Sequence, residues 1–78
     1  MITPEFKSSI LKELRLDDYE IKDETLANQI PGWDSINHIN VISAIEKDFN
    51  VRFKSIEILK CKNLGDLQNL LTSKLAKK

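Results

Sequence analysis

The fold of this chain is decided by the stretch Ile30-Pro31-Gly32-Trp33-Asp34-Ser35-Ile36-Asn37-His38-Ile39. Pro31 and Gly32 are typical of a turn, and Asp34 is one of the residues preferred at the N-cap of a helix. Ser35 therefore stands at the first position of a predicted helix. Backbone amides at this position lack partners within the helix, and the helix dipole makes this end positive. Because such an end stabilises a phosphate group, the pattern indicates a modified serine rather than an ordinary active site.

The helix that begins at Ser35 is expected to end at Phe49, with Asn50 as a left-handed stop. A step of about 100° per residue separates this helix into two faces. The inward face consists of His38, Val41, Ile42, Ile45 and Phe49. The outward face consists of Ile36, Ile39, Asn40, Ser43, Glu46 and Lys47. The outward face thus adds two apolar residues near Ser35 to an otherwise polar surface.

The two outward apolar residues have two interpretations. In one, Ile36 packs under the preceding loop, since loops often cover helix ends. In the other, which we favour, Ile36 and Ile39 form a small docking site for proteins that must find Ser35. His38, the single histidine, is expected to be buried or half-buried with a hydrogen bond to loop backbone, or else to line the path of a group attached to Ser35.

Three further helices complete the predicted all-α fold. The first follows the N-cap Thr3, with Pro4 in its first turn. A short helix is expected to begin at Ser55, acting as its cap, and to end at position 59 or 60. The last helix follows the N-cap Asn63. Apolar residues at helical spacing supply the buried faces of the first and last helices: Phe6, Ile10, Leu11, Leu14, Leu67, Leu70, Leu71 and Leu75.

A long connection, residues 16–34, joins the first two long helices. Loops of this length in compact domains are usually functional or contain short structure of their own. We expect one helical turn within residues 24–29. Spaced apolar residues are expected to pin the loop onto the core: Tyr19, Ile21, Leu26 and Ile30.

The length and composition argue for one small domain, residues 1–78, that is not an enzyme. A chain of 78 residues has a thin core and little room for a cleft with several converging side chains. With one histidine, one cysteine and no paired carboxylates, no nucleophile and base can be assembled, and no metal site is expected. Cys61 is expected to be a part-buried structural residue. No apolar run reaches membrane-spanning length, so we expect a cytoplasmic protein.

The net charge is zero but unevenly distributed. Residues 1–34 carry eight acidic and four basic side chains, and residues 35–78 carry four acidic and eight basic ones. A basic second half raises the alternative of a small helical DNA-binding module, for which Asn37 and Asn40 could contact bases. However, the basic residues are scattered and no aromatic residues lie between them. We therefore expect no nucleic-acid partner.

Taken together, these residues resemble the acyl carrier protein family, the phosphopantetheine-binding acyl or peptidyl carrier domains. Gly32-Trp33-Asp34-Ser35-Ile36 matches the Gly-x-Asp-Ser-Leu signature of that family, with Ile36 in place of leucine. Ile45-Glu46-Lys47-Asp48-Phe49 resembles its leucine–acidic run–phenylalanine pattern, and Asn63-Leu64-Gly65-Asp66-Leu67 resembles the start of its last helix. The resemblance covers nearly the whole chain. It implies a four-helix acyl-carrier-type bundle with three longer helices, one short helix and a long first loop.

The resemblance implies that Ser35 carries 4′-phosphopantetheine, whose thiol holds acyl groups as thioesters. The arm would come from coenzyme A through a phosphopantetheinyl transferase, which must supply the activating base because none is placed here. Asp34 would be both the N-cap and a recognition carboxylate, with Ile36 and Ile39 as further recognition residues. The other implied partners are an acyl- or aminoacyl-loading ligase and a downstream acyltransferase or synthase. The carrier itself is expected to be a monomer.

Two departures from the family pattern favour a specialised pathway, such as polyketide, nonribosomal peptide or modified fatty-acid synthesis. Pro31 stands where many fatty-acid carriers have leucine, and Trp33 replaces a small residue. The helix after Ser35 is also less acidic than in fatty-acid carriers, which matters because enzymes with basic patches are steered by such acidity. A housekeeping fatty-acid carrier and an interaction domain that has lost modification are the alternatives. The intact Ser35 counts against the second, and the cargo stays open.

Overall fold

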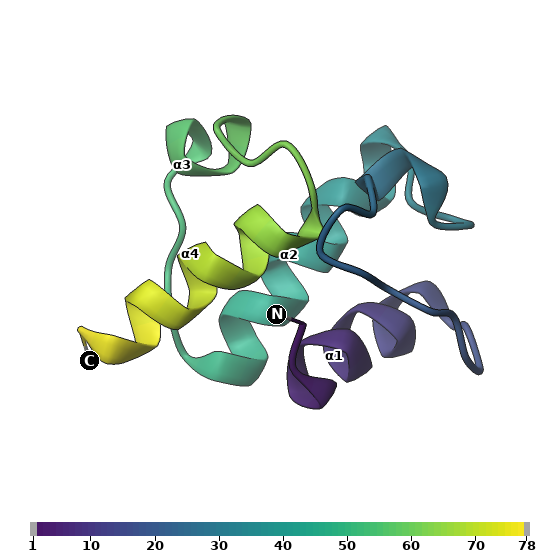
Figure 1. The fold of residues 1–78 in the computed structure, drawn as a ribbon, viewed down its shortest axis with the longest axis horizontal. Helices are drawn as coiled ribbons and strands as arrows, with labels where there is room; N and C mark the ends of the chain where they lie inside the picture. The colour runs from purple at the N-terminus through teal and green to yellow at the C-terminus, as the bar shows by residue number, and fades with distance from the viewer. Residues whose placement is uncertain (1, 78) are drawn as a thin grey trace.

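The computed structural model describes residues 2–77, which form helices joined by loops (Figure 1). Helix α1 spans Pro4–Leu14, the 3₁₀ helix η1 spans Ala27–Gln29, α2 spans Ser35–Phe49, α3 spans Ser55–Leu59 and α4 spans Leu64–Ala76. No strand occurs among the described residues. The predicted all-α fold, with three longer helices, one short helix and a long first loop, is confirmed. Within residues 2–77, no helix has both the length and the apolarity that crossing a membrane requires.

Local capping explains where the long helices begin and end. The Thr3 hydroxyl accepts a hydrogen bond from the Phe6 amide at 3.3 Å, and the Asn63 side chain accepts one from the Asp66 amide at 2.9 Å. Asn50 ends α2 with φ 53°, in the left-handed region that asparagine tolerates. These caps confirm the predicted N-cap residues of α1 and α4 and the predicted end of α2.

The start of α3 differs from the prediction. Ser55 is the first residue of the helix rather than its cap, and the N-cap position is occupied by Lys54. The Lys54 amide donates to the carboxylate of Glu57 at 2.8 Å. A carboxylate three residues into the helix therefore satisfies the backbone at this end, and a serine cap is not needed.

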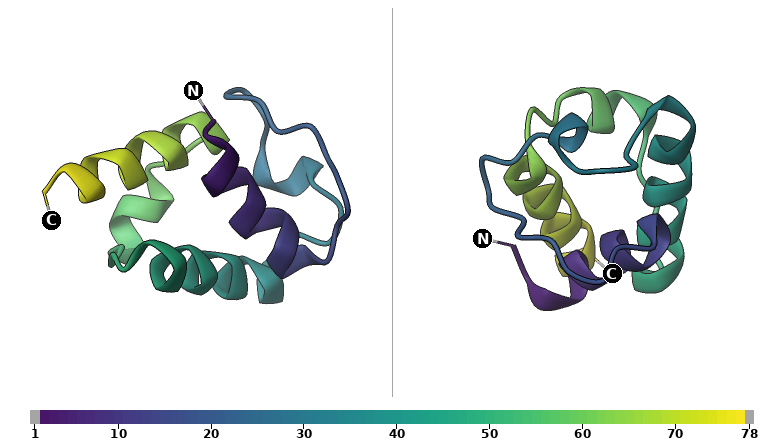
Figure 2. Two further views of the ribbon diagram at one scale, coloured as in Figure 1. Left: turned by 90° about the horizontal axis from the view of Figure 1, so that it is seen from below. Right: turned by 90° about the vertical axis from the view of Figure 1, so that its right-hand side faces the viewer.

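The core is enclosed by α1, α2 and α4. In Figure 1, α3 lies at the upper left and the long loop runs up the right-hand side, and Figure 2 shows the same separation from below. Polar bonds hold these helices in place: the Ser9 hydroxyl on α1 donates to Asp48 on α2 at 2.5 Å, and the Gln68 amide oxygen on α4 accepts from the Thr3 backbone at 3.0 Å. The largest fully buried side chains come from these three helices: Phe6, Ile10, Val41, Ile45, Leu64 and Leu71.

The long loop is pinned to the core by some, but not all, of the predicted residues. Ile21 and Ile30 are buried, and the Tyr19 hydroxyl donates to the Gln29 carbonyl at 3.0 Å. Leu26 is 41% exposed, so its predicted burial is wrong. Leu26 stands immediately before η1, where its amide donates to the Gln29 side chain at 2.9 Å, and this local turn keeps it at the surface. The predicted turn within residues 24–29 is confirmed in its last three positions, Ala27–Gln29.

A close backbone approach joins this loop to α4. The Gly65 amide donates to the Asp23 carbonyl at 2.9 Å. A Cβ atom on Gly65 would lie 2.8 Å from that carbonyl oxygen and 3.0 Å from the Asp23 Cα. Because these are backbone atoms, the loop could accept a side chain at position 65 only by moving away from the helix.

We therefore expect Gly65→Ala to lower the free energy of unfolding by about 1–3 kcal/mol, the usual cost of overpacking. Helix propensity alone predicts the opposite, a gain of about 1 kcal/mol. Urea denaturation distinguishes the two effects. Asn69→Ala, at an exposed position of the same helix, is the control for propensity, and a Gly65→Ala protein as stable as that control would contradict the close approach.

Candidate functional site

A tight turn leads the chain into α2. The Trp33 amide donates to the Ile30 carbonyl at 3.2 Å, which closes a turn with Pro31 and Gly32 at its centre. Gly32 has φ +83°, which a type II turn requires at its third residue and which glycine adopts without strain. The Gly32 carbonyl also accepts a hydrogen bond of 2.7 Å from the Asn37 side chain, so the turn is tied to the first turn of the helix.

Asp34 caps α2 as predicted. One carboxylate oxygen accepts hydrogen bonds from the amides of Ile36 and Asn37, at 3.1 and 2.8 Å. Its backbone carbonyl accepts the first intrahelical bond, from the His38 amide at 2.8 Å. The carboxylate thus satisfies two of the amides that a helix start leaves without partners and stabilises the positive end of the helix dipole.

Ser35 lies at the surface at the first position of α2. Among residues 2–77, no hydrogen-bond partner is found for its hydroxyl group. Within the described part of the chain, no histidine or other base is hydrogen-bonded to this hydroxyl, so none of these residues activates the serine. An exposed and unpartnered hydroxyl at a positive helix end leaves room for a phosphate ester.

Trp33 and His38 form a pair directly beneath this surface. The indole Nε1–H donates to His38 Nδ1 at 3.0 Å, and the ring centroids lie 6.0 Å apart. Trp33 is only 8% exposed, whereas His38 is half-buried. The expected half-burial of His38 is confirmed, but its expected bond to loop backbone is wrong, because the Trp33 indole supplies the donor. With Nδ1 as acceptor, the neutral ring carries its proton on Nε2.

The outward face of α2 is apolar near Ser35. Ile36 is 76% exposed and Ile39 is 68% exposed, so packing of Ile36 under the loop is excluded. Ile56 and Leu59 on α3 are also exposed, at 60% and 83%. Single exposed apolar residues are common, but Ile39 and Leu59 line the same groove between α2 and α3.

Two features that could suggest chemistry do not form a site. Burial, reinforced by the carboxylates of Asp66 and Glu57, raises the pKa of the Cys61 thiol, so the thiol stays protonated and unreactive. Cys61 is half-buried and its Sγ contacts the Glu57 carbonyl at 3.4 Å, as expected for a structural residue. Within residues 2–77, no three histidine, cysteine or acidic side chains come together as metal ligands.

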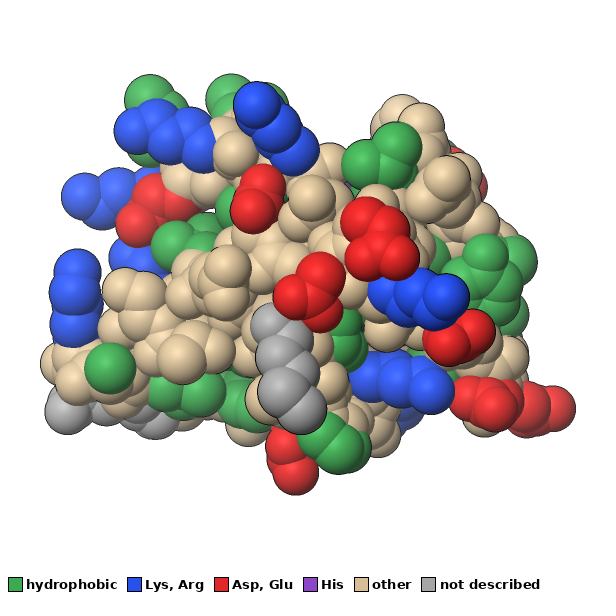
Figure 3. Space-filling view, viewed as in Figure 1, with side chains coloured by type: hydrophobic (Ala, Val, Ile, Leu, Met, Phe, Trp, Pro, Cys, Tyr) green, Lys and Arg blue, Asp and Glu red, His purple; other side chains and the backbone are tan. Residues whose placement is uncertain are grey.

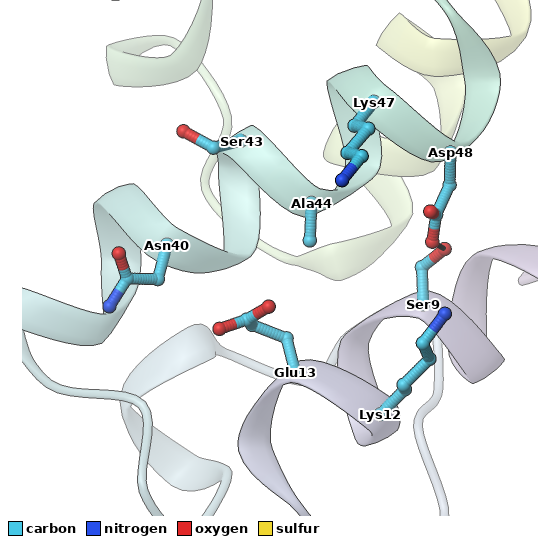
Figure 4. A pocket seen from close by; sticks show the side chains of 8 residues that line it. All are labelled: Ser9, Lys12, Glu13, Asn40, Ser43, Ala44, Lys47 and Asp48. Carbon is cyan, nitrogen blue, oxygen red and sulfur yellow. Dashed lines mark hydrogen bonds between the residues drawn. The ribbon is translucent and has the colours of Figure 1, made fainter.

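A polar hollow of about 400 Å³ lies between α1 and α2 (Figure 4). Most of its side chains are polar or charged, and each helix contributes one lysine and one acidic group. The residues that line it are Ser9, Lys12, Glu13, Asn40, Ser43, Ala44, Lys47 and Asp48. Ser35 is not one of them, so this hollow does not belong to the site at the start of α2.

Comparison with known families decides the class of protein. A family model described as a phosphopantetheine attachment site matches residues 5–71. The chain belongs to this family. It is a carrier protein of the acyl carrier type, with 4′-phosphopantetheine as its covalently attached cofactor.

A solved structure of another carrier protein has the same fold as this chain. The chain is similar to the holo acyl carrier protein from Geobacter metallireducens, studied in solution by NMR, with a TM-score of 0.86 and 33% sequence identity. The similarity covers 96% of this chain and 90% of that one. No curated protein sequence matches the carrier significantly.

Sequence patterns alone missed two parts of this site. The Trp33–His38 bond joins residues five apart, and no environment was predicted for Trp33. A tryptophan just before a cap and a lone histidine one turn later were the available signals. The exposed pair on α3, Ile56 and Leu59, was also missed. A five-residue helix shows too little periodicity to reveal which of its faces is solvated.

The cap at Asp34 can be tested directly. We expect Asp34→Ala to lower the free energy of unfolding by about 0.5–2 kcal/mol, because two amides of α2 lose their acceptor. Asp34→Asn keeps a capping oxygen and is expected to lose much less. Equal losses in the two variants, measured by urea denaturation, would show that the charge rather than the capping bonds matters.

Proposed function

We propose that Ser35 is the attachment point of 4′-phosphopantetheine and that the protein carries acyl intermediates for a specialised biosynthetic pathway. The proposal treats residues 1–78 as one carrier domain that is monomeric, cytoplasmic and not itself an enzyme. The observation that carries it is the exposed, unpartnered Ser35 hydroxyl at the capped start of α2. When attached, the arm supplies a terminal thiol that holds an acyl group as a thioester.

The residues of the chain position the serine but do not activate it. The turn at Gly32 and the cap at Asp34 fix the start of α2, so the hydroxyl of Ser35 is presented at a defined place and direction. His38 Nδ1 accepts from Trp33 and is not available as a base toward Ser35. The phosphopantetheinyl transferase must therefore remove the hydroxyl proton while the serine oxygen forms its bond to phosphorus. The pyrophosphate bond of coenzyme A breaks in the same step and releases adenosine 3′,5′-bisphosphate.

We assign partner recognition to Asp34, Ile36 and Ile39, which surround Ser35. Both isoleucines project from the surface of α2, and exposed apolar groups beside a site to be modified supply the area that a docking enzyme can bury. The carboxylate of Asp34 is exposed and adjoins the hydroxyl that reacts. The expected binding partners are the transferase, an acyl- or aminoacyl-loading ligase and a downstream acyltransferase or synthase.

The surface charge supports a specialised rather than a housekeeping pathway. Asn40, Ser43 and Lys47 are exposed on α2, so its outward face is close to neutral. Around α3 the exposed charges are basic, and Figure 3 shows Lys and Arg side chains gathered with hydrophobic ones over this helix. Enzymes that attract carriers through basic patches would associate with such a surface with little electrostatic steering.

Intact-mass spectrometry tests the attachment point. The protein is incubated with coenzyme A and a broad-specificity phosphopantetheinyl transferase. We expect one added arm on the wild type and none on Ser35→Ala. Ser55→Ala is a matched control, because Ser55 is also an exposed serine at the first position of a helix. An arm on the Ser35→Ala protein would refute the assignment.

The same assay, followed over time, tests the recognition residues. Ile39→Ala is expected to lower kcat/KM for arm transfer by about tenfold, the effect of losing one well-buried apolar contact in the complex. Leu75→Ala, on the partly exposed surface of α4, controls for a general loss of apolar area.

The choice of pathway is tested with housekeeping fatty-acid elongation enzymes. We expect turnover of the loaded carrier to be at least about tenfold slower than that of a housekeeping carrier, because electrostatic steering is weak. Asn40→Glu/Ser43→Glu should recover part of this difference, whereas Asn69→Glu/Ser73→Glu adds the same charge on α4 and should not. Turnover by the wild type at the housekeeping rate would contradict the specialised role.

A further inference from the structure

Two hollows that share His38 and Ile58 in their linings lie on the α3 side of α2. The outer one is a surface groove of about 360 Å³ between α2 and α3, with Ile42 and Phe53 in its lining. The inner one measures only about 60 Å³ and reaches the core residues Leu64 and Leu67 of α4. The groove begins at His38, one helical turn or about 5 Å along α2 from Ser35. A group tethered to Ser35 therefore reaches the groove within one helical turn.

His38 and Ile58 line both hollows and so form the partition between them. Trp33 lies behind this partition, in the lining of the inner hollow. Its ring is 8% exposed although it stands two residues before the exposed Ser35, so the indole fills interior space directly beneath the attachment site.

The inner hollow is too small for an alkyl chain. Its volume of about 60 Å³ is room for about two groups the size of a water molecule, whereas a cavity of about 150 Å³ is known to hold benzene. The hydrogen bond of 3.0 Å between Trp33 Nε1 and His38 Nδ1 holds both rings in the lining between the groove and the core residues Leu64 and Leu67. Moving either ring leaves a buried polar nitrogen without its partner, which is unfavourable.

We propose that Trp33, held by His38, closes the interior of the domain to the attached acyl chain, so that this carrier is suited to short or polar acyl groups. The inference rests on the proposed attachment at Ser35. A short group fits the outer groove, whose lining mixes apolar side chains with the polar groups of Ser43, Glu46 and Ser55. This groove is open to solvent, so a long alkyl chain that lies in it stays partly in contact with water.

Thermal unfolding of loaded carriers tests this closure. Butanoyl and octanoyl arms are transferred from the corresponding coenzyme A thioesters to the wild type and to Trp33→Leu, Trp33→Ala and His38→Ala. In the wild type, the two loaded forms are expected to melt at the same temperature. In the three variants, the octanoyl form should melt higher than the butanoyl form by about 4 °C or more, because the chain enters the opened interior. Phe6→Leu, a core change that lines neither hollow, should show no difference between the two arms.

Two results overturn the proposal. One is a wild-type octanoyl form that melts about 4 °C or more above its butanoyl form, because the chain then already enters the core. The other is equal melting of both arms in folded Trp33 variants, because Trp33 is then not what closes the interior. The wild-type comparison stands even if the alanine variant does not fold.

Titration with benzene tests the closure without any arm. The amide resonances of Leu64 and Leu67 are followed by NMR in unmodified protein. Benzene should shift them in Trp33→Ala, where the indole volume is vacated, and leave them unchanged in the wild type. Shifts in the wild type overturn the closure, whereas a failure of attachment at Ser35 affects only the loading reaction. The two proposals can therefore fail separately.

Discussion

The carboxylate of Asp34 and the two amides that it accepts from, those of Ile36 and Asn37, fix the point at which α2 begins. The rest of the site depends on this point. The helix start fixes which residue is first, and hence that Ser35 faces solvent with an unpartnered hydroxyl. The preceding turn, closed at Gly32 and tied to Asn37, keeps the loop from covering the serine. A change of one residue in register would place a different side chain at the positive end of the helix.

The residues on either side of the Asp34 cap change from buried to exposed within four positions. Trp33 points into the protein and is 8% exposed, whereas Ile36 is 76% exposed. The inner side is rigid because the indole bonds to His38 one turn into α2. The outer side presents apolar side chains that are largely exposed. A carrier needs this division, because its attachment site must be held firmly and yet be accessible to several enzymes in turn.

Much of this arrangement could be predicted from the sequence, because it depends on local signals. Caps and stops such as Thr3, Asp34 and Asn50 act within a few residues, and helical spacing sorted the two faces of α2. Two features could not be predicted, one set by a local side-chain bond and one by a contact between distant segments. The burial of Leu26 was wrong because a local turn to Gln29, rather than the core, determines its position. The approach of Asp23 to Gly65 joins residues far apart in the chain, and no sequence pattern marks it.

The short helix α3 has no fully buried residue, and it is joined to α4 through an ion pair between Glu57 and Lys74 at 2.8 Å. The hydrogen bond to Lys74, helped by the Lys54 amide, lowers the pKa of the Glu57 carboxyl. The ion pair therefore stabilises the fold fully at pH values above the pKa that the Glu57 carboxyl has in the unfolded chain. This stabilisation is lost as the pH falls through the lowered pKa of the folded protein. An element with so little buried surface opens more readily than the three long helices around it. One wall of the α2–α3 groove can thus adjust its position to different visiting enzymes while the helix that bears Ser35 keeps its shape.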